Sequence, residues 1–387
     1  MLSVNGARLL DRINELGAIG KDEEGRRTRL AASDTEKQGR DKVVSWMEDA
    51  GLKVVVDRIG NIFGIWETEE NKDKKPLMIG SHIDTVINAG QYDGCLGVIG
   101  AIEVIRTLKE AGRQSERPIV ACAFTNEEGV RYSPDMMGSL VYAGGLLVDQ
   151  VLKTVGIDGT ILGEELKRIG YAGSVEPGFL QPDAFVELHI EQGPIMDTAV
   201  ENLQGIHWQR VTIEGLANHA GTTPTNLRVD AGLAAAKINV FLRELVKKSG
   251  GVATVGCIEH EPNAINVIPS KAVMTVDLRN PDKGKLDADE KSLAAYFKEL
   301  EETDHVKISS ERLTEFDPVL FDENIVQKIE AAALARELNT RRMTSGAGQD
   351  AQMMARICPT AMIFVPSIKG ISHNPKEYTP DEDCVAG

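Results

Sequence analysis

The hydrophobic pattern of the first 190 residues alternates between helical spacing and short apolar runs. Helices are expected over residues 3–19 and 33–50, the second ending at Gly51, and over 97–111. Short apolar runs predict strands at 53–57, 62–67, 76–80 and 118–125, and a further one at 184–189. Alternation of strands and helices favours an α/β domain with a mainly parallel sheet flanked by helices.

The pattern changes near residue 205. Strands are expected at 209–214, 252–259, 271–278 and 306–312, with helices at 228–249 and 285–301, which together make a compact α+β unit of βαββαβ order. A helix at 323–338 and an apolar strand at 361–365 then return to the first pattern. The chain is therefore predicted to form a discontinuous catalytic domain, residues 1–204 and 323–387, with a smaller domain, 205–322, inserted in it.

Length and charge narrow the class of protein. A chain of 387 residues favours two domains, and 42% hydrophobic with 26% charged residues is typical of a soluble globular protein. The net charge of −16 argues against nucleic acid and against anionic membrane surfaces as partners. The N-terminus lacks the apolar core of a signal peptide, and no run is long enough for a membrane span. Five scattered cysteines indicate reduced thiols in the cytoplasm, and Cys95 is interpreted as structural.

Candidate ligands follow the predicted strands. His82 and Asp84 come directly after one apolar run, Asp93 lies in a glycine-rich loop, and Glu127 and Glu128 follow the strand at 118–125. His189 and His373 stand in the same setting, each beside an apolar strand. The carboxyl ends of parallel strands meet at one edge of a sheet, where α/β proteins keep their active sites.

This mixture of imidazole and carboxylate suits divalent metals, and one aspartate can bridge two ions. Two such ions can share a hydroxide and hold an amide carbonyl. Glu127, beside Glu128, is then the expected general base. Asp84 is expected to stand behind His82 and accept the second ring N–H of that histidine.

Each of these residues also has a plainer interpretation. A lone histidine at a strand end is usually a hydrogen-bonded structural residue, paired glutamates usually form a solvated face, and Asp93 could serve the turn. Coincidence favours the metal hypothesis, because four of the seven histidines (82, 189, 219 and 373) stand in such polar, glycine-rich contexts. His305 is interpreted as a surface residue, and His207 and His260 receive no assignment.

The second domain carries different chemistry. His219 lies in a turn of small residues, Asn266 just precedes a strand, and Arg279 follows one. Together these side chains suit a substrate carboxylate and a developing oxyanion. The alternative is a surface ion pair between Arg279 and Asp277.

Over nearly its whole length, the chain resembles the dinuclear metallohydrolases of the aminoacylase and carboxypeptidase-G type. More narrowly it is similar to the hydantoinase/carbamoylase amidases, which include N-carbamoyl-L-amino-acid hydrolases, β-ureidopropionases and allantoate amidohydrolases. The motifs that carry the resemblance are GSHIDTV (80–86), YDGCLGV (92–98), TNEEGVR (125–131), ELHIEQGP (187–194), NHAGTTP (218–224), NAINVIP (263–269), DLR (277–279), SGAGQDAQ (345–352) and GISHNP (370–375).

The resemblance implies two divalent ions in each subunit: Zn, Mn, Co or Ni. One ion would be held by His82, Asp93 and His189, and the other by Asp93, Glu128 and His373, with Asp93 bridging. Glu127 would activate the bridging water.

It also implies a homodimer formed through the smaller lid domain, with substrate residues that come in part from the partner subunit. Arg279 and Asn266 would grip the substrate carboxylate, His219 would steady the oxyanion, and Gln192 would line the pocket.

Three departures stand out. Gln349 occupies a position where the similar proteins usually have histidine, and a glutamine can hydrogen-bond but cannot shuttle a proton. The connection between Ile195 and Gly205 is shorter than in those proteins, which carry an extra turn and strand there. The chain also ends at Gly387, where the resemblance leads us to expect a final helix.

The hypothesis is a cytoplasmic, dimeric amidohydrolase of N-carbamoyl-L-amino acids or of a ureido acid such as allantoate, releasing ammonia and carbon dioxide. Its substrate is a small molecule with a free carboxylate, and no nucleic acid or membrane partner is expected. One alternative is a dipeptidase or N-acyl-amino-acid hydrolase with the same metals. Another is an inactive small-molecule-binding protein of the same fold, against which the presence of Glu127 speaks.

Overall fold

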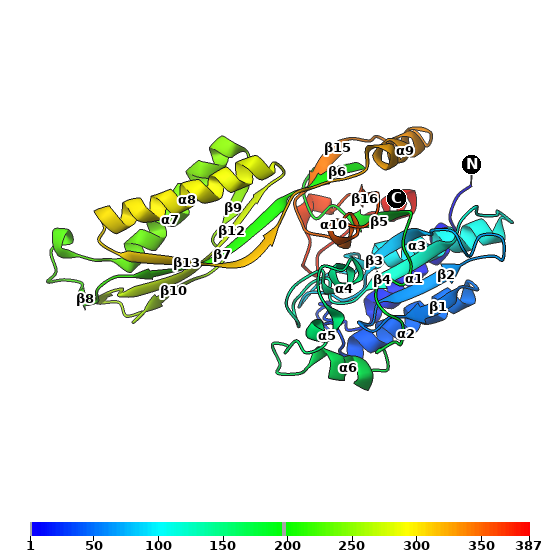
Figure 1. The fold of residues 1–387 in the computed structure, drawn as a ribbon, viewed down its shortest axis with the longest axis horizontal. Helices are drawn as coiled ribbons and strands as arrows, with labels where there is room; N and C mark the ends of the chain where they lie inside the picture. The colour runs from blue at the N-terminus through cyan, green and yellow to red at the C-terminus, as the bar shows by residue number, and fades with distance from the viewer. Residues whose placement is uncertain (1, 196–198) are drawn as a thin grey trace. The chain divides into compact units, whose positions relative to one another are not determined.

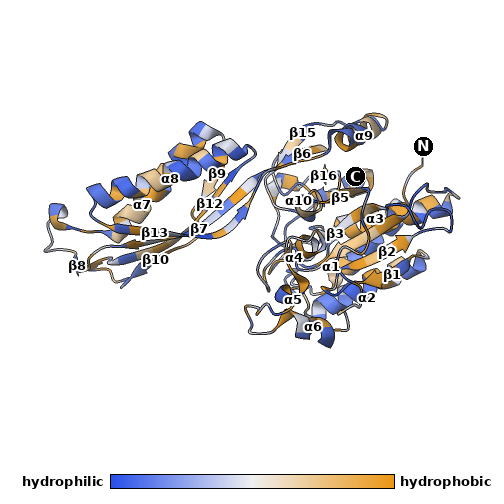
Figure 2. Ribbon diagram, in the orientation of Figure 1, coloured by the Kyte–Doolittle hydropathy of each residue, from blue (hydrophilic) through white to orange (hydrophobic). Residues whose placement is uncertain are grey.

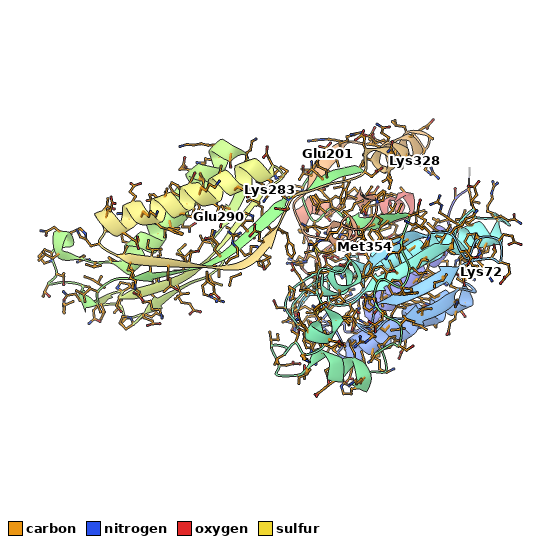
Figure 3. The ribbon with its side chains drawn as sticks, in the orientation of Figure 1. Lys72, Glu201, Lys283, Glu290, Lys328 and Met354 are labelled. Atoms are coloured by element: carbon orange, nitrogen blue, oxygen red, sulfur yellow. The ribbon has the colours of Figure 1, made fainter. Side chains whose placement is uncertain are left out.

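The computed structural model describes residues 2–195 and 199–387, and its chain divides into two compact units (Figure 1). The first comprises Met1–Glu201 and Phe321–Gly387, and the second is Asn202–Leu320. Glu201, labelled in Figure 3, is the last residue before the chain enters the second unit. No helix among residues 2–195 and 199–387 combines the length and hydropathy needed to cross a membrane.

The sheet of the first unit has the order β1-β2-β4-β3-β5-β16-β6-β14, and β15 also pairs with β6. Its described strands are β1 (Lys53–Val56), β2 (Ile62–Trp66), β3 (Leu77–His82), β4 (Ile119–Phe124), β5 (Ala184–Ile190), β6 (Ala199–Leu203), β14 (Val319–Leu320), β15 (Arg342–Ser345) and β16 (Thr360–Val365). The four neighbours β4, β3, β5 and β16 are mutually parallel, whereas β1, β2 and β6 run antiparallel to their neighbours. The predicted α/β class with a mainly parallel central sheet is confirmed.

The register of the parallel strands brings the predicted ligands level with one another. β3 pairs with β5 so that Leu77 lies opposite Ala184 and Ile79 opposite Val186. Continued to the strand ends, the same register places His82 opposite His189, and their ring centroids are 5.9 Å apart. The edge of the sheet therefore presents two imidazoles side by side.

Helices cover this sheet, and the hydrophobic core of the first unit lies between the helices and the strands. They are α1 (Gly6–Ala18), α2 (Asp34–Asp49), α3 (Cys95–Glu110), α4 (Met137–Tyr142), α5 (Val148–Val151), α6 (Leu162–Arg168), α9 (Glu323–Leu334), α10 (Asp350–Met354) and α11 (Asp381–Ala386), with a short 3₁₀ turn, η2 (Ile368–Gly370). Figure 2 shows β2 to β4 and α3 as mostly hydrophobic, as expected of strands buried on both faces and the helix that packs on them. Helix α3 is buried along most of its length.

The second unit is an antiparallel sheet with two long helices. The sheet order is β10-β12-β7-β13, with β9 also paired to β12, and a separate pair joins β8 to β11. The elements are β7 (Gly205–Glu214), β8 (Asn218–His219), η1 (Thr225–Leu227), α7 (Ala231–Ser249), β9 (Val252–Thr254), β10 (Ile258–Glu261), β11 (Val267–Ile268), β12 (Lys271–Asn280), α8 (Lys283–Thr303) and β13 (Lys307–Phe316). Every second residue of β12 is buried, and α7 and α8 meet where Phe241 stacks on Tyr296 at 4.0 Å.

Two sequence expectations need correction here. The single strand expected at 252–259 is two strands, β9 and β10, interrupted at residues 255–257 around Gly256, since glycine weakens a strand interior. The connection after Ile195 contains a strand, β6, for which no pattern was recognised. Residues 196–198 of that connection lie outside the described residues.

Candidate metal centre

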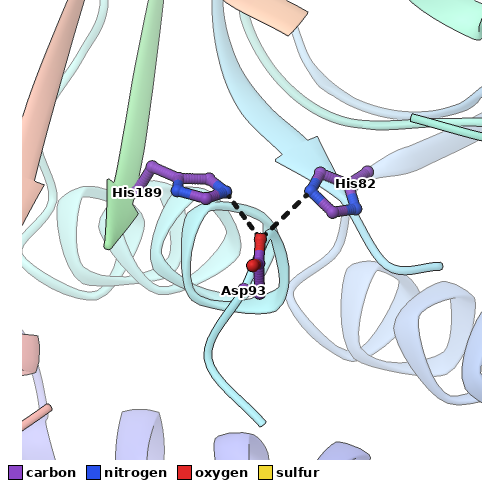
Figure 4. Close-up of side chains that lie close together, drawn as sticks. All are labelled: His82, Asp93 and His189. Atoms are coloured by element: carbon purple, nitrogen blue, oxygen red, sulfur yellow. Dashed lines mark ion pairs between the residues drawn. The ribbon is translucent and has the colours of Figure 1, made fainter. Parts of the chain in front are cut away.

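His82 and His189 point from the ends of β3 and β5 toward Asp93 (Figure 4). The Nδ1 atom of His82 lies 3.0 Å from the carbonyl oxygen of Asp84, and that of His189 lies 2.9 Å from the carbonyl oxygen of Ile190. A carbonyl only accepts, so both Nδ1 atoms carry the proton. This is the tautomer that a metal ligand needs, because it leaves the proton off Nε2. The Nε2 atom of His189 accepts the backbone N–H of Gly94 at 3.1 Å.

Asp93 is placed by the turn that starts α3. Its Oδ1 lies 3.1 Å from His189 Nε2 and 3.6 Å from His82 Nε2. The next residue, Gly94, has a left-handed φ of 63°, and a Cβ there would lie 2.4 Å from His82 Nε2. Gly97, one turn later, lets the helix approach β5, because a Cβ would lie 2.4 Å from the Leu188 carbonyl. Glycine at both positions thus brings the carboxylate to the histidines.

The first group of ligands fits a divalent cation. His82, Asp93 and His189 are all buried, and their ligand atoms lie within 4.8 Å of one another. His82 Nε2 is buried without a hydrogen-bond partner among the described residues. A buried polar atom without a hydrogen-bond partner is costly, and two imidazoles with a carboxylate are ligands that zinc, manganese, cobalt and nickel accept. The geometry therefore supports a cation at this point.

A second group shares Asp93. Glu128 Oε2 and Asp93 Oδ2 lie 3.4 and 3.5 Å from His373 Nε2. These three ligand atoms also fall within 4.8 Å of one another, but the His373 side chain is 50% exposed. His373 adopts a left-handed φ of 53°, a conformation that non-glycine residues hold only where surrounding contacts fix it. The two oxygens of Asp93 thus face two different groups of ligands.

Glu127 lies beside the first group. Its Oε2 is 3.4 Å from His82 Nε2, and its side chain is 9% exposed. Asn126, with a left-handed φ of 57°, turns the chain so that Glu127 and Glu128 reach neighbouring points. Burial is the largest cause that raises the pKa of both glutamates well above the usual range, and the neighbouring carboxylates add to it.

The same cluster of buried charged groups shifts the pKa values of His82 and Asp93. Burial lowers the pKa of His82, but Glu127, Asp93 and Asp84 outweigh it and the net shift is well upward. Burial likewise opposes the charged form of Asp93, yet the two histidines hold its pKa well below the usual range. This buried concentration of carboxylates is a setting in which a cation is stabilised.

Asp84 acts differently from the prediction. Its carboxylate Oδ1 lies 3.7 Å from His82 Nδ1, whereas its main-chain carbonyl lies at 3.0 Å and accepts the ring N–H. The carboxylate instead accepts the backbone N–H groups of Glu127 and Glu128, at 3.1 and 3.2 Å. The turn at Asp84 directs its side chain toward the glutamate loop, so this residue orients the histidine through its backbone and the glutamates through its side chain.

His219 and Asn266 lie together in the second unit. β8 and β11 pair with His219 opposite Val267, and the N–H of Ala220 donates to the Asn266 carbonyl at 3.0 Å. His219 is exposed, and its Nδ1 accepts the N–H groups of Gly221 and Thr222 at 3.0 and 3.2 Å. Its ring proton is therefore on Nε2, so the exposed nitrogen is a hydrogen-bond donor.

Arg279 stands apart from that pair. It lies near the end of β12, while β11 with its neighbour Asn266 lies before the start of that strand. Arg279 follows Lys271 by eight positions along the strand, which is roughly 26 Å at 3.3 Å per residue. Its guanidinium pairs with Asp277 at 2.9 Å, as the alternative interpretation expected. Within one chain, therefore, Arg279 does not share a pocket with His219 and Asn266.

Comparison with known proteins gives this arrangement a context. The model of Peptidase family M20/M25/M40 matches residues 78–387, which include all the ligand candidates. The chain belongs to this family.

Two curated relatives align along nearly the whole chain. N-carbamoyl-L-amino-acid amidohydrolase of Rhizobium meliloti is 38% identical over 392 residues, covering 99% of this chain and 94% of that protein. Ureidoglycolate hydrolase of Arabidopsis thaliana is 36% identical over 405 residues, covering 100% and 85%. A solved amidase of the hydantoinase/carbamoylase family from Burkholderia multivorans is 38% identical, with a TM-score of 0.94, and the match covers 100% of this chain and 95% of that one. The resemblance noted from the motifs is confirmed.

Three residues contact Asp93 in ways that the sequence did not predict, namely Glu377, Ser372 and Gln192. Glu377 accepts the backbone N–H groups of Tyr92 and Asp93 at 2.9 and 3.3 Å, and Ser372 Oγ lies 3.0 Å from Asp93 Oδ2. Burial, with Asp93 next, raises the pKa of Glu377 to about 7. Gln349, noted for its departure from histidine, donates to Gln192, which in turn donates to Asp93 Oδ2. The GISHNP motif lies two residues before Glu377 and was the only available signal for it.

Proposed function

We propose that this chain is a metal-dependent amidohydrolase that cleaves the carbamoyl (ureido) C–N bond of N-carbamoyl-L-amino acids or of a related ureido acid such as allantoate. The observation that carries the proposal is the pair of ligand groups that share Asp93, with Glu127 beside them. Relatives that match the whole chain carry carbamoyl-amino-acid and ureido-acid hydrolase names.

Two divalent ions fit these residues. His82, Asp93 and His189 would hold one, and Asp93, Glu128 and His373 the other, with zinc, manganese, cobalt and nickel all acceptable to this set of ligands. When bound, the ions supply Lewis-acid polarisation of the carbamoyl carbonyl and make water acidic enough to ionise near neutral pH.

Glu127 serves as the general base. Its carboxylate takes a proton from the attacking water, whose oxygen then bonds to the carbamoyl carbon. The C–N bond to the terminal nitrogen breaks, and Glu127 returns the proton to the departing ammonia. The remaining carbamate loses carbon dioxide and leaves the free amino acid, so one water is consumed for each ammonia and each carbon dioxide released.

The second unit supplies substrate recognition and the dimer. Its Arg279 and Asn266 would bind the substrate carboxylate, and the Nε2–H of its His219 would stabilise the oxyanion. Gln192, which belongs to the first unit, would line the pocket. The separation of roughly 26 Å along β12 between Arg279 and the start of the strand supports a site that draws on two copies of the chain. A homodimer through the second unit provides this arrangement.

The cytoplasm is the proposed location. All five cysteines are free, four of them buried and Cys257 exposed, which supports a reducing compartment.

A substrate panel tests the proposal. Protein loaded separately with Mn²⁺, Co²⁺ or Zn²⁺ is assayed for ammonia release from N-carbamoyl-L-amino acids, allantoate and ureidoglycolate, and for cleavage of dipeptides and N-acetyl-amino acids. Ammonia from a carbamoyl or ureido substrate is the expected result. Cleavage of dipeptides or acyl amino acids alone would favour the peptidase alternative. Metal binding without any hydrolysis would favour a binding protein.

A further inference from the structure

A chain of two glutamine side chains leads from α10 to the carboxylate shared by both ligand groups. Gln349 Nε2 donates to Gln192 Oε1 at 2.9 Å, and Gln192 Nε2 donates to Asp93 Oδ2 at 2.8 Å. Gln349 is 1% exposed at the N-cap position of α10. All three residues belong to the first unit. We propose that Gln349 is a positioning residue that acts through Gln192 to hold Asp93 in its bridging orientation and so strengthens binding of the more exposed of the two metal ions.

Gln349 decides which way the Gln192 amide faces. An amide side chain can present either its oxygen or its NH₂ group, and the hydrogen-bond network selects between them. Gln349 gives its N–H to Gln192 Oε1, so the NH₂ end of Gln192 is turned toward Asp93. Without that donor, a flipped amide would place its oxygen against a carboxylate oxygen, which repels it.

The backbone conformation of Gln192 also directs its side chain toward Asp93. Its φ is left-handed at 61°, and its N–H donates to the buried Ser367 Oγ at 3.0 Å. Such a conformation costs free energy unless surrounding contacts enforce it, and it aims the side chain at Asp93. The amide and the backbone of this residue thus serve one orientation.

The count of acceptor positions on Asp93 Oδ2 leaves room for an ion. A carboxylate oxygen has about two acceptor directions, and Gln192 occupies one. Ser372 Oγ reaches the other at 3.0 Å, but it also lies 3.2 Å from Glu377 Oε2 and has a single proton to give. When that proton goes to Glu377, the second direction of Oδ2 is open toward Glu128 and His373. The hydrogen bond from Gln192 keeps the carboxylate plane in place for it.

The inference rests on the metal centre of the proposed function, and its test measures metal binding without substrate. Protein stripped by chelation is titrated calorimetrically with Mn²⁺ alone. Gln349→Met, of similar size but without a donor, is expected to weaken the second binding event by about tenfold, the lower end of the range for residues that orient metal ligands, and the first event by less than about threefold. Gln192→Met should do the same. The double variant should lose no more than the larger single loss, because both residues act along one path.

Controls separate positioning from folding. Gln349→His keeps one N–H donor and should restore the second event to within about twofold of the wild type. Gln209→Met removes a buried glutamine amide of the second unit and should change neither event. Circular dichroism and thermal unfolding verify that each variant is folded. If the methionine variant does not fold, Gln349→Asn makes the same test, since its amide is one methylene short of Gln192.

Unchanged or tighter binding of the second ion by folded Gln349→Met or Gln349→Asn would overturn the proposal. Additive losses in the double variant would also overturn it, since Gln349 would then act by another path. If the titration behaves as expected while the wild type hydrolyses no member of the substrate panel, the positioning role stands and the proposed function fails.

Discussion

The carboxylate of Asp84 accepts the backbone N–H of Glu127 at 3.1 Å, while its carbonyl accepts the ring N–H of His82 at 3.0 Å. One residue therefore fixes both a proposed metal ligand and the proposed base. Its carboxylate is buried and receives the N–H of Glu128 as well.

Asp84→Asn is expected to lower kcat far more than it weakens metal binding. The amide nitrogen of asparagine cannot accept, so one of the two backbone N–H groups loses its partner, at a cost of about 1–3 kcal/mol. The glutamate loop shifts, but the carbonyl that orients His82 remains. Steady-state kinetics and metal analysis check this, with the exposed Asp73→Asn as the control. Equal losses of bound metal and of kcat would contradict the assignment of the Asp84 carboxylate to the loop that carries Glu127 and Glu128.

Glu127→Gln is expected to retain its metal ions and lose activity. Glutamine keeps the size of the side chain but cannot take a proton, and general-base catalysis contributes about 10²–10⁴-fold to rate. Metal content by mass spectrometry and kcat for the best substrate of the panel are compared with those of the exposed control Glu69→Gln. An active Glu127→Gln would mean that another group is the base.

Gly94→Ala is expected to abolish tight binding of the first ion. The added methyl group would lie 2.4 Å from His82 Nε2, at the point where the lone pair must reach the cation. Gly112→Ala is a matched control, because Gly112 has nearly the same φ, 64°, with no atom within 4 Å of the added carbon. It should cost only the backbone strain of about 1 kcal/mol and bind metal normally. Equal metal affinity in both variants would refute the steric argument.

Mixed dimers test the proposal that each site draws on two copies of the chain. Glu127→Gln and His219→Ala should each be nearly inactive alone. If His219 acts on the partner's metal centre, a dimer of one variant chain and one of the other carries both lesions in one site and leaves the second site intact. Random exchange of chains should then restore about a quarter of wild-type activity, since half the dimers contain one working site. No recovery, with mixed dimers verified by affinity tags, would place His219 in the site of its own chain.

Asp57 gives the first unit a measurable response to pH. Burial raises its pKa to about 7, against hydrogen bonds from Asn61 and Ile59 that lower it. The folded state therefore binds the proton more tightly than the unfolded state, whose pKa is near 3.8. The stabilisation is full below that value and is lost as pH rises through 7, a change of about 4 kcal/mol at most.

Asp57→Asn should accordingly flatten the dependence of the unfolding free energy on pH between 4 and 7. Urea unfolding at several pH values measures the slope, and Asp73→Asn serves again as the exposed control. A slope identical to that of the wild type would mean that Asp57 is not the group responsible.

The proximity of His82, Asp93 and His189 was predictable for two reasons. Parallel strands end at one edge of a sheet, and the glycine-rich YDGCLGV motif (92–98) places a carboxylate there. The assignment of Asp93, Glu128 and His373 to a second ligand group depended on the family resemblance, since His373 follows a strand far along the chain. The role of the Asp84 carboxylate was not predictable, because spacing does not say which way a side chain leaves a turn. Contacts of Asp93 with Ser372 and Gln192 depend on loop conformations with left-handed residues, for which no local pattern was recognised.

The second unit begins and ends in adjacent positions. Asn202 of β6 lies opposite Leu320 of β14, and the N–H of Phe321 donates to the Glu201 carbonyl at 3.0 Å. A segment whose two ends are hydrogen-bonded neighbours occupies the place of a hairpin turn in the sheet of the first unit. The gene for the first unit could therefore acquire, exchange or lose this insert without rebuilding the strands that carry the metal ligands, so the proposed substrate recognition and the proposed hydrolytic chemistry can evolve at separate rates.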